Sequence, residues 1–76
     1  MEKRISKVMS AVFEIPVIEI NRESSPDTIE SWDSLKHMKL ILALEEEFEV
    51  EFTENEVVEM LSFQLIIMVL KDHGIN

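Results

Sequence analysis

Apolar residues recur at helical spacing in the first segment of the chain, which predicts an amphipathic helix of about three turns. Polar side chains such as Lys3, Lys7 and Ser10 occupy the opposite face. We expect Pro16 to end this helix, because proline lacks the backbone N–H that a continuing helix needs. The apolar positions are Ile5, Val8, Met9, Val12 and Phe13.

Residues 16–33 contain Pro, Ser, Asn and Asp too often to hold a helix, and we expect a long loop there. Loops of more than about 12 residues in compact domains are usually functional or disordered. Apolar side chains recur through the segment, so we expect the loop to pack on the core at those points; a disordered loop is the alternative. These apolar positions are Val17, Ile18, Ile20, Ile29 and Trp32.

A second amphipathic helix is predicted from Asp33 or Ser34, both favourable N-terminal residues, through Phe48. Residues that break helices are almost absent from this segment. We expect one broad apolar face to cover the core, formed by Leu35, Met38, Ile41, Leu42 and Phe48 and widened by Leu40 and Leu44.

Residues 53–56, Thr-Glu-Asn-Glu, predict the start of a short third helix through a capping box. In this arrangement the Thr53 hydroxyl accepts from the Glu56 backbone N–H, while the Glu56 carboxylate reaches back to the Thr53 N–H. We expect this helix to end at about Leu61.

Residues 63–73 are predicted to form a fourth helix, which Ser62 caps and Gly74 ends. This segment is apolar nearly all round, so it has to be largely buried or to face a partner. The predicted fold is therefore all-α. We expect a four-helix bundle with a short third helix and a long loop between the first two helices, in a single domain over residues 1–76.

Composition limits the possible functions. The chain has 76 residues, 7 basic and 16 acidic side chains, a formal net charge of −9 and no cysteine. Charge of this sign disfavours nucleic acid and anionic lipid as ligands and favours basic partners.

The longest apolar run, residues 65–70, is far shorter than the roughly 18 residues of a membrane-spanning helix. No signal-type apolar core is present, so we expect a cytoplasmic protein. The lack of cysteine excludes thiol chemistry by the chain itself.

The negative charge is concentrated in residues 45–59, called here the acidic segment, which holds eight acidic side chains and no basic one. The rest of the chain is nearly balanced, with eight acids against seven bases. Considered alone, such a run of acidic residues is most simply interpreted as a surface of the protein that faces solvent.

Ser34 is the candidate for chemistry, because it lies between a long loop and the first turn of a helix. The first backbone N–H groups of a helix have no intrahelical partner and carry partial positive charge, which favours a phosphate ester. The alternative is a serine that only caps the helix. A hydrolase with His37 as the base for Ser34 is disfavoured, since no glycine-framed nucleophile elbow exists and no third group is placed to orient the histidine.

The sequence around Ser34 resembles the acyl carrier protein family of phosphopantetheine-bearing carriers. Asp33-Ser34-Leu35 is followed by Met-Lys-Leu-Ile-Leu-Ala-Leu-Glu-Glu-Glu-Phe over residues 38–48, by Val50-Glu51-Phe52 and by an acidic third helix. A tripeptide recurs often by chance, but here motif, helix length, acidic segment, preceding loop and total length all agree. The resemblance is close over residues 30–70 and only architectural before them.

The resemblance implies that Ser34, within the motif Asp33-Ser34-Leu35, is the attachment site of a 4'-phosphopantetheine arm. A phosphopantetheinyl transferase would move the arm from coenzyme A onto the Ser34 hydroxyl, and the terminal thiol of the arm would carry acyl or aminoacyl groups as thioesters. The reactive sulfur would then come from the prosthetic group, and a carrier benefits from having no competing thiol. The chain itself would be a monomer without catalytic residues or a metal site.

The resemblance also implies a docking surface and an acyl pocket. The acidic segment would dock basic patches of acyl-loading and acyl-using enzymes and steer their association. Some family members shelter a short acyl chain between the second and third helices, although for Met38, Val57, Met60 and Leu61 burial in the core is the preferred interpretation. The predicted partner-binding residues are Met38, Lys39, Glu45, Glu46, Glu51, Glu54 and Glu56, and the predicted acyl-pocket residues are Leu42, Val57, Met60 and Leu61.

Lys36, His37 and Lys39 depart from the carriers of fatty-acid synthesis, which usually have acidic residues just after the serine. A lysine in the first turn opposes the helix dipole at a cost of about 0.3–1 kcal/mol, and an anion at Ser34 would reverse that sign. We hypothesise that Lys36, with Lys39, either neighbours the phosphodiester or contacts an acidic patch on a dedicated partner. This favours a carrier of a specialised biosynthetic pathway. The competing class is an unmodified acidic adaptor that acts only through protein–protein interaction.

Overall fold

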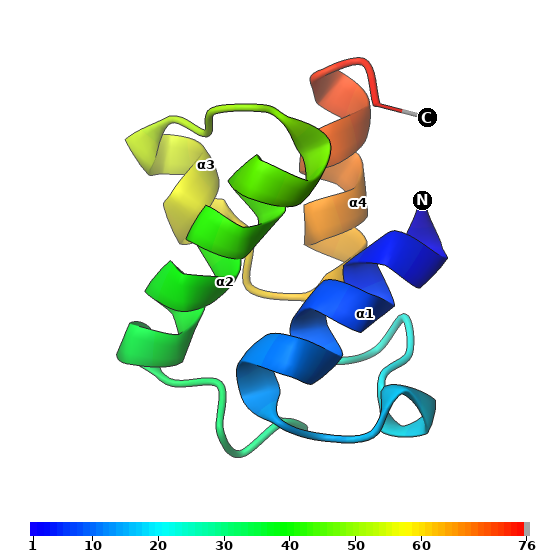
Figure 1. Ribbon diagram of the computed structural model, residues 1–76. Coiled ribbons are helices and arrows are strands. Elements are labelled where there is room, and N and C mark those ends of the chain that lie inside the picture. Colours follow the sequence, from blue (N-terminus) through cyan, green and yellow to red (C-terminus); the bar gives the residue numbers. More distant parts are fainter. Residues whose placement is uncertain (76) are drawn as a thin grey trace.

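The computed structural model describes residues 1–75, which form four α-helices and one short 3₁₀ helix (Figure 1). In chain order these elements are α1 (Glu2–Phe13), η1 (Val17–Glu19), α2 (Ser34–Phe48), α3 (Glu54–Glu59) and α4 (Phe63–Asp72). α1 packs closely on α2, and the short α3 lies at the edge of the bundle (Figure 1). The all-α bundle with a short third helix and a long first loop is therefore confirmed.

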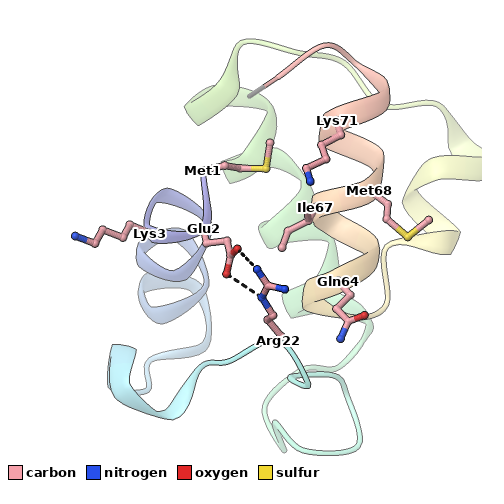
Figure 2. Close-up of a pocket in the computed structure, with 8 residues that line it drawn as sticks. All are labelled: Met1, Glu2, Lys3, Arg22, Gln64, Ile67, Met68 and Lys71. Atoms are coloured by element: carbon pink, nitrogen blue, oxygen red, sulfur yellow. Dashed lines mark hydrogen bonds and ion pairs between the residues drawn. The ribbon is translucent and has the colours of Figure 1, made fainter.

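The start of α1 meets α4 and the loop on one side of the bundle (Figure 2). The Arg22 guanidinium donates to the Glu2 carboxylate at 2.6 Å, and this hydrogen bond holds the pKa of Glu2 below its ordinary value. A cavity of about 600 Å³ lies between these elements. Its lining residues are Met1, Glu2, Lys3, Arg22, Gln64, Ile67, Met68 and Lys71.

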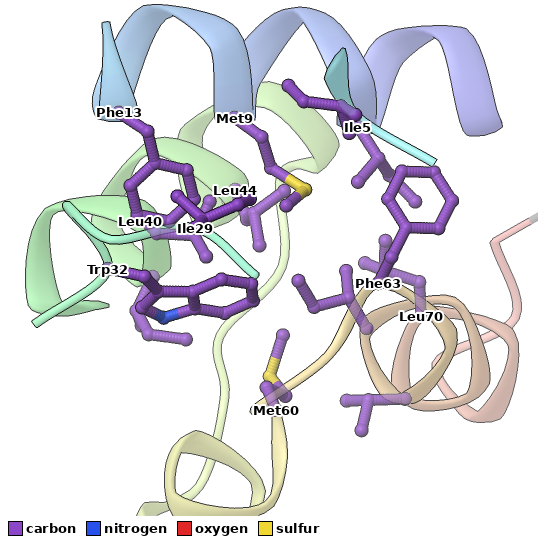
Figure 3. Packing of buried hydrophobic residues seen from close by; sticks show 14 of the residues in the cluster. Ile5, Met9, Phe13, Ile29, Trp32, Leu40, Leu44, Met60, Phe63 and Leu70 are labelled. Atoms are coloured by element: carbon purple, nitrogen blue, oxygen red, sulfur yellow. The ribbon is translucent and has the colours of Figure 1, made fainter. Parts of the chain in front are cut away.

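The hydrophobic core lies between α1, α2, α4 and the loop (Figure 3). Side chains of α1 point toward those of α2 and α4, and Trp32 of the loop packs beneath Phe13 with ring centroids 4.9 Å apart (Figure 3). Burial of this apolar surface is the main stabilising contribution in a chain without disulfides. The buried apolar residues are Ile5, Met9, Phe13, Ile20, Ile29, Trp32, Leu40, Ile41, Leu44, Phe48, Met60, Phe63, Ile66, Val69 and Leu70.

Side-chain caps set the starts of three helices, as the sequence predicts. The Asp33 carboxylate accepts from the Lys36 N–H before α2. Thr53 forms the predicted capping box before α3, and the Ser62 hydroxyl accepts from a backbone N–H in the first turn of α4. α1 ends at Phe13, before Pro16, because Glu14 adopts a left-handed conformation with φ 57°.

The loop between α1 and α2 is ordered by turns of its own and by contacts with the core. The Ser24 hydroxyl accepts from the Asn21 N–H at 2.9 Å, which is a typical turn-forming bond of a short hydroxyl side chain. The Ser24 carbonyl accepts from the Phe63 N–H at 2.9 Å and so joins the loop to the start of α4. The packed loop is confirmed at Ile20, Ile29 and Trp32, which are buried.

The predicted burial of Val17 and Ile18 is wrong, because these side chains are 49% and 91% exposed. Both belong to η1, a single 3₁₀ turn in which successive side chains point about a third of a turn apart. One turn of this kind cannot direct all its apolar side chains to the same side. Ile20, just after the turn, reaches the core instead.

The predicted core face of α2 is only partly correct. Ile41 and Phe48 are buried together with Leu40 and Leu44, whereas Leu35, Met38 and Leu42 are 66%, 49% and 62% exposed. α2 carries apolar residues on two sides, and helical periodicity does not decide which side meets α1. The core meets the side centred on Leu40 and Leu44.

α4 is largely buried, as predicted, although its apolar surface is not fully covered. Phe63, Ile66, Val69 and Leu70 lie in the core, and the remaining apolar side chains include Leu65 and Met68, which are 38% and 59% exposed. Gly74 follows the helix with φ 84°, in the conformation expected of a C-terminal stop. Within residues 1–75, no helix is long and apolar enough to cross a membrane.

Met60 is fully buried directly after α3, whereas its neighbour Leu61 is 46% exposed. We predict that Met60→Ala lowers the free energy of unfolding by about 2–5 kcal/mol, because it leaves a cavity in the core. Leu61→Ala, the matched control, should change it by no more than about 0.5 kcal/mol. Urea denaturation measures both values. Equal effects of the two substitutions would contradict the placement of Met60 in the core.

Candidate functional site

Ser34 is the first residue of α2, and its side chain is exposed. The preceding Asp33 carboxylate accepts from the Lys36 N–H at 2.8 Å, so one of the unpaired N–H groups of the first turn is satisfied. Within residues 1–75, the backbone N–H groups of Ser34 and Leu35 have no hydrogen-bond acceptor. These donors point outward beside an accessible hydroxyl, which suits an anionic ester on Ser34.

The segment before Ser34 is anchored to the C-terminal end of α1. The Ser31 hydroxyl donates to the Phe13 carbonyl at 3.1 Å, and Trp32 is buried against the Phe13 ring. An aromatic pair of this kind contributes both buried apolar area and a defined geometry. The position of Ser34 is therefore fixed by the core although its own side chain is in solvent.

Lys36 joins the first turn of α2 to the last turn of α1. Its ammonium donates to the Val12 carbonyl at 3.1 Å and forms an ion pair with Glu14 at 3.2 Å. A cation at the C-terminal end of a helix interacts favourably with the helix dipole, so this charge stabilises α1 while it opposes the dipole of α2. The hypothesis that Lys36 neighbours a phosphodiester stays a prediction. The second lysine of that hypothesis, Lys39, has an exposed side chain.

Both ring nitrogens of His37 are occupied by partners other than Ser34. The Trp32 indole N–H donates to His37 Nδ1 at 3.0 Å, and His37 Nε2 lies 2.7 Å from the Val57 carbonyl oxygen. A general base needs a free nitrogen within hydrogen-bond reach of the nucleophile. This arrangement does not support the hydrolase alternative, in which His37 would activate Ser34.

Exposed apolar side chains form a stripe beside Ser34, called here the apolar stripe. On α2 they follow the serine at the spacing of a single helix face. Two more apolar side chains, in α3 and just after it, are 68% and 46% exposed. Exposed apolar side chains along one helix face are typical of interaction sites. The apolar stripe consists of Leu35, Met38 and Leu42 on α2, and the two further exposed side chains are Val58 and Leu61.

The predicted acidic docking residues fall into two groups. Glu45 is half-buried and its carboxylate accepts from the Phe52 N–H at 2.9 Å, so it holds the connection to α3. Glu56 is similarly engaged in the α3 capping box. In contrast, Glu46, Glu51 and Glu54 are exposed and form no ion pair among the described residues. Across residues 1–75, no three acidic or histidine side chains converge as a metal site would require.

The four predicted acyl-pocket residues lie in different environments. Met60 is fully buried in the core and Val57 is half-buried, whereas Leu42 and Leu61 are 62% and 46% exposed. None of them lines the cavity between α1 and α4. The preferred core interpretation is correct for Met60 and wrong for Met38 and Leu61, which lie on the surface. The acyl pocket stays a prediction.

The part of the chain that the structure describes is an all-helical bundle with an exposed serine at the start of its second helix, beside the apolar stripe and exposed carboxylates. The chain is 37% identical over 65 residues to an acyl carrier protein of Buchnera aphidicola subsp. Schizaphis graminum, covering 84% of this chain and 81% of that protein. It is 33% identical over 73 residues to an acyl carrier protein of Buchnera aphidicola subsp. Baizongia pistaciae, covering 96% and 94%. No protein-family model matches the chain. The chain belongs to the acyl carrier protein family.

Three functional contacts could not be anticipated from the sequence. Glu45 supports the backbone before α3, and Arg4 donates to Glu47 at 2.8 Å while its guanidinium lies 4.3 Å from the Phe48 ring centroid. These contacts join residues that only the fold brings together. The bond from Trp32 to His37 had only a weak signal in the sequence, because a buried indole N–H needs an acceptor but Ser34 and His37 both offer one in the first turn of the next helix.

Glu56 gives α3 a pH-dependent stability. The Thr53 backbone N–H donates to its carboxylate at 2.9 Å and His73 Nε2 lies 3.0 Å away, so the pKa of Glu56 is lowered from its ordinary value of 4.5. A carboxylate with a lowered pKa stabilises the fold when the pH is above the pKa of the group in the unfolded chain. This contribution is lost as the pH falls through the pKa of the group in the folded protein.

We predict that Glu56→Gln is less stable than the unsubstituted chain near pH 7 and that the difference shrinks as the pH falls below about 4.5. Glutamine keeps a side-chain acceptor for the Thr53 N–H, so the substitution mainly removes the charge. Urea midpoints measured at several pH values test this. A difference that stays constant over the whole range would contradict the role of the Glu56 charge.

Proposed function

We propose that this chain is an acyl carrier whose Ser34 hydroxyl bears a 4'-phosphopantetheine arm. The observation that carries the proposal is the exposed Ser34 side chain at the first residue of α2, next to backbone N–H groups without an acceptor, in a member of the acyl carrier protein family. When bound, the arm supplies a thiol that holds acyl or aminoacyl groups. The chain has no cysteine, so that thiol would have no competitor.

The residues around Ser34 fit a phosphodiester. Asp33 carries the carboxylate that is nearest to Ser34 along the chain. Because this carboxylate accepts from the Lys36 N–H, its repulsion of a phosphodiester is partly offset. The Ser34 and Leu35 N–H groups remain as donors toward an anion. Because Trp32 and Lys36 hold the first turn from both sides, the arm would leave the protein from a fixed point.

The partners in this proposal are a phosphopantetheinyl transferase and the enzymes that load and use the acyl group. The apolar stripe beside Ser34 offers them a desolvated contact, and the exposed Glu46, Glu51 and Glu54 attract basic patches. A short acyl chain would shelter between α2 and α3. The residues proposed to line that space are Leu42, Val57, Met60 and Leu61.

We further propose a non-catalytic, cytoplasmic and monomeric carrier of a specialised biosynthetic pathway. Support for a dedicated pathway comes from the residues that follow Ser34, where Lys36 and Lys39 replace the acidic residues usual in carriers of fatty-acid synthesis. Lys36 contributes to the fold through its contacts with α1, which leaves the exposed Lys39 as the side chain for a distinctive partner.

Incubation with coenzyme A, Mg²⁺ and a promiscuous phosphopantetheinyl transferase tests the attachment site. We predict a single phosphopantetheine adduct in the intact mass, absent in Ser34→Ala and retained in Ser62→Ala, which removes a comparable serine at the start of α4. No adduct on the unsubstituted chain would support the unmodified adaptor. Labelling of Ser34 by a fluorophosphonate would instead support a hydrolase.

Lys39→Glu tests the dedicated partner. We predict that this substitution slows loading by the cognate acyl-loading enzyme and that the effect is larger at low salt, because an exposed charge acts mainly on the association rate. Lys7→Glu is the matched control, since it makes the same charge change on the exposed face of α1. Lys36→Glu would also impair loading, but it places a carboxylate beside Glu14 and so disturbs the fold. Equal rates for Lys39→Glu and Lys7→Glu would contradict the hypothesis.

A further inference from the structure

His37, one turn after Ser34, joins two other parts of the chain through its ring. Its Nδ1 accepts from the Trp32 indole N–H at 3.0 Å, and its Nε2 lies 2.7 Å from the Val57 carbonyl oxygen in α3. An indole N–H can only donate and a carbonyl oxygen can only accept. Both contacts are satisfied only by a neutral imidazole that carries its proton on Nε2.

The Trp32 contact is part of the core. Trp32 is 4% exposed, and its ring lies nearly parallel to the His37 ring, edge to edge through the hydrogen bond, with centroids 6.1 Å apart and an interplanar angle of 22°. A buried donor that loses its acceptor incurs the desolvation penalty of an unmade hydrogen bond. Throughout the described part of the chain, every buried side-chain nitrogen and oxygen has a partner. His37 satisfies the indole of the residue two positions before Ser34.

The Val57 contact matters because α3 has few other polar attachments. None of the residues of α3 is buried, and its capping box is internal to the helix and its N-cap. Within residues 1–75, side-chain hydrogen bonds reach α3 from His37 in α2 and from His73 after α4, whose Nε2 lies 3.0 Å from the Glu56 carboxylate. Apolar packing of Val57 and Met60 also holds α3 on the core, and the His37 ring is the polar contact that joins α3 to the first turn of α2.

We propose that His37 is a positioning residue for the carrier: its neutral ring fixes α3 to Trp32 and to the first turn of α2. Ser34, the apolar stripe and the exposed glutamates of α3 then meet a partner enzyme as one rigid surface. This inference rests on the proposed function, because it assigns His37 a role in recognition by the enzymes that act on the carrier. Binding to a preorganised surface avoids the cost of ordering α3 in each encounter.

Two substitutions separate the two bonds of His37. In His37→Asn the amide oxygen lies at the level of Nδ1, so it can accept from Trp32 but cannot reach Val57. In His37→Gln the amide nitrogen lies at the level of Nε2, so it can still donate to the Val57 carbonyl. The two variants are similar in polarity, and each keeps one of the two bonds of His37: His37→Asn keeps the bond to Trp32, and His37→Gln keeps the bond to Val57.

Hydrogen exchange on the unmodified chain measures the attachment of α3. We expect the amides of α3 to exchange about tenfold faster in His37→Asn, the effect of one lost hydrogen bond, while α1 and α4 keep their protection. His37→Gln should keep the protection of α3. A uniform loss over all helices, or unchanged exchange of α3 in His37→Asn, would overturn the proposal.

The protonation site of His37 is tested without any substitution. We expect ¹⁵N NMR of the unsubstituted chain near neutral pH to show the His37 ring with its proton on Nε2 and a bare Nδ1. A proton on Nδ1 would overturn the proposal, because that ring cannot accept from Trp32.

Kinetics with a phosphopantetheinyl transferase connects the positioning role to function. We expect the KM for the carrier to rise several-fold in His37→Asn with little change in kcat, and to stay near the original value in His37→Gln. If the unsubstituted chain takes no arm on Ser34, the proposed function fails. If both variants take the arm with the original KM, the proposed function stands and the role of His37 in recognition fails.

Discussion

The buried indole of Trp32 is the contact on which the region around Ser34 depends. It supplies a large apolar surface to the core beside Phe13, and its N–H has to find an acceptor there because water is excluded. His37 provides that acceptor from the first turn of α2. One side chain of the loop therefore decides how the end of α1 and the start of α2 come together, and with them the position of an exposed serine.

Charged residues near the site act on the backbone as much as on each other. Lys36 donates to the Val12 carbonyl of α1, Glu45 accepts from the N–H of Phe52, and Glu56 accepts from that of Thr53. Such charge-assisted bonds satisfy backbone groups at helix ends and connections, where no intrahelical partner exists. The acidic segment is thus partly structural, because some of its carboxylates are committed to backbone groups of the fold.

The fold could be predicted largely from the sequence because its signals are local. The Thr53 to Glu56 capping box, the serine before α4 and the helical spacing in α1 each act within a few residues. The choice between the two apolar sides of α2 could not be predicted, because Leu35 and Leu40 are equally hydrophobic and only the packing of α1 distinguishes them. The burial of Ile18 was predicted wrongly because a single short turn gives no periodicity that could indicate its buried side.

The position of Ser34 at the start of α2 was predictable from the sequence, whereas the contacts around it were much less so. A serine at a helix start after a long loop is a sequence signal. In contrast, Lys36 contacts Val12 across 24 positions of the chain, and His37 contacts Val57 across 20. Long-range contacts of this kind follow from tertiary packing and leave no local pattern. They nevertheless determine which polar side chains are free to recognise a partner and which are committed to the fold.

The composition of the core gives the chain an optical property of its own. Trp32 is the only tryptophan and no tyrosine is present, so the near-ultraviolet emission of the protein comes from one indole, two positions before Ser34. That indole is hydrogen-bonded to an imidazole ring, a neighbour whose displacement would alter the emission. Attachment of the proposed arm, or contact with a proposed partner, would change the surroundings of this indole, and the fluorescence of a single residue in unlabelled protein would report that change.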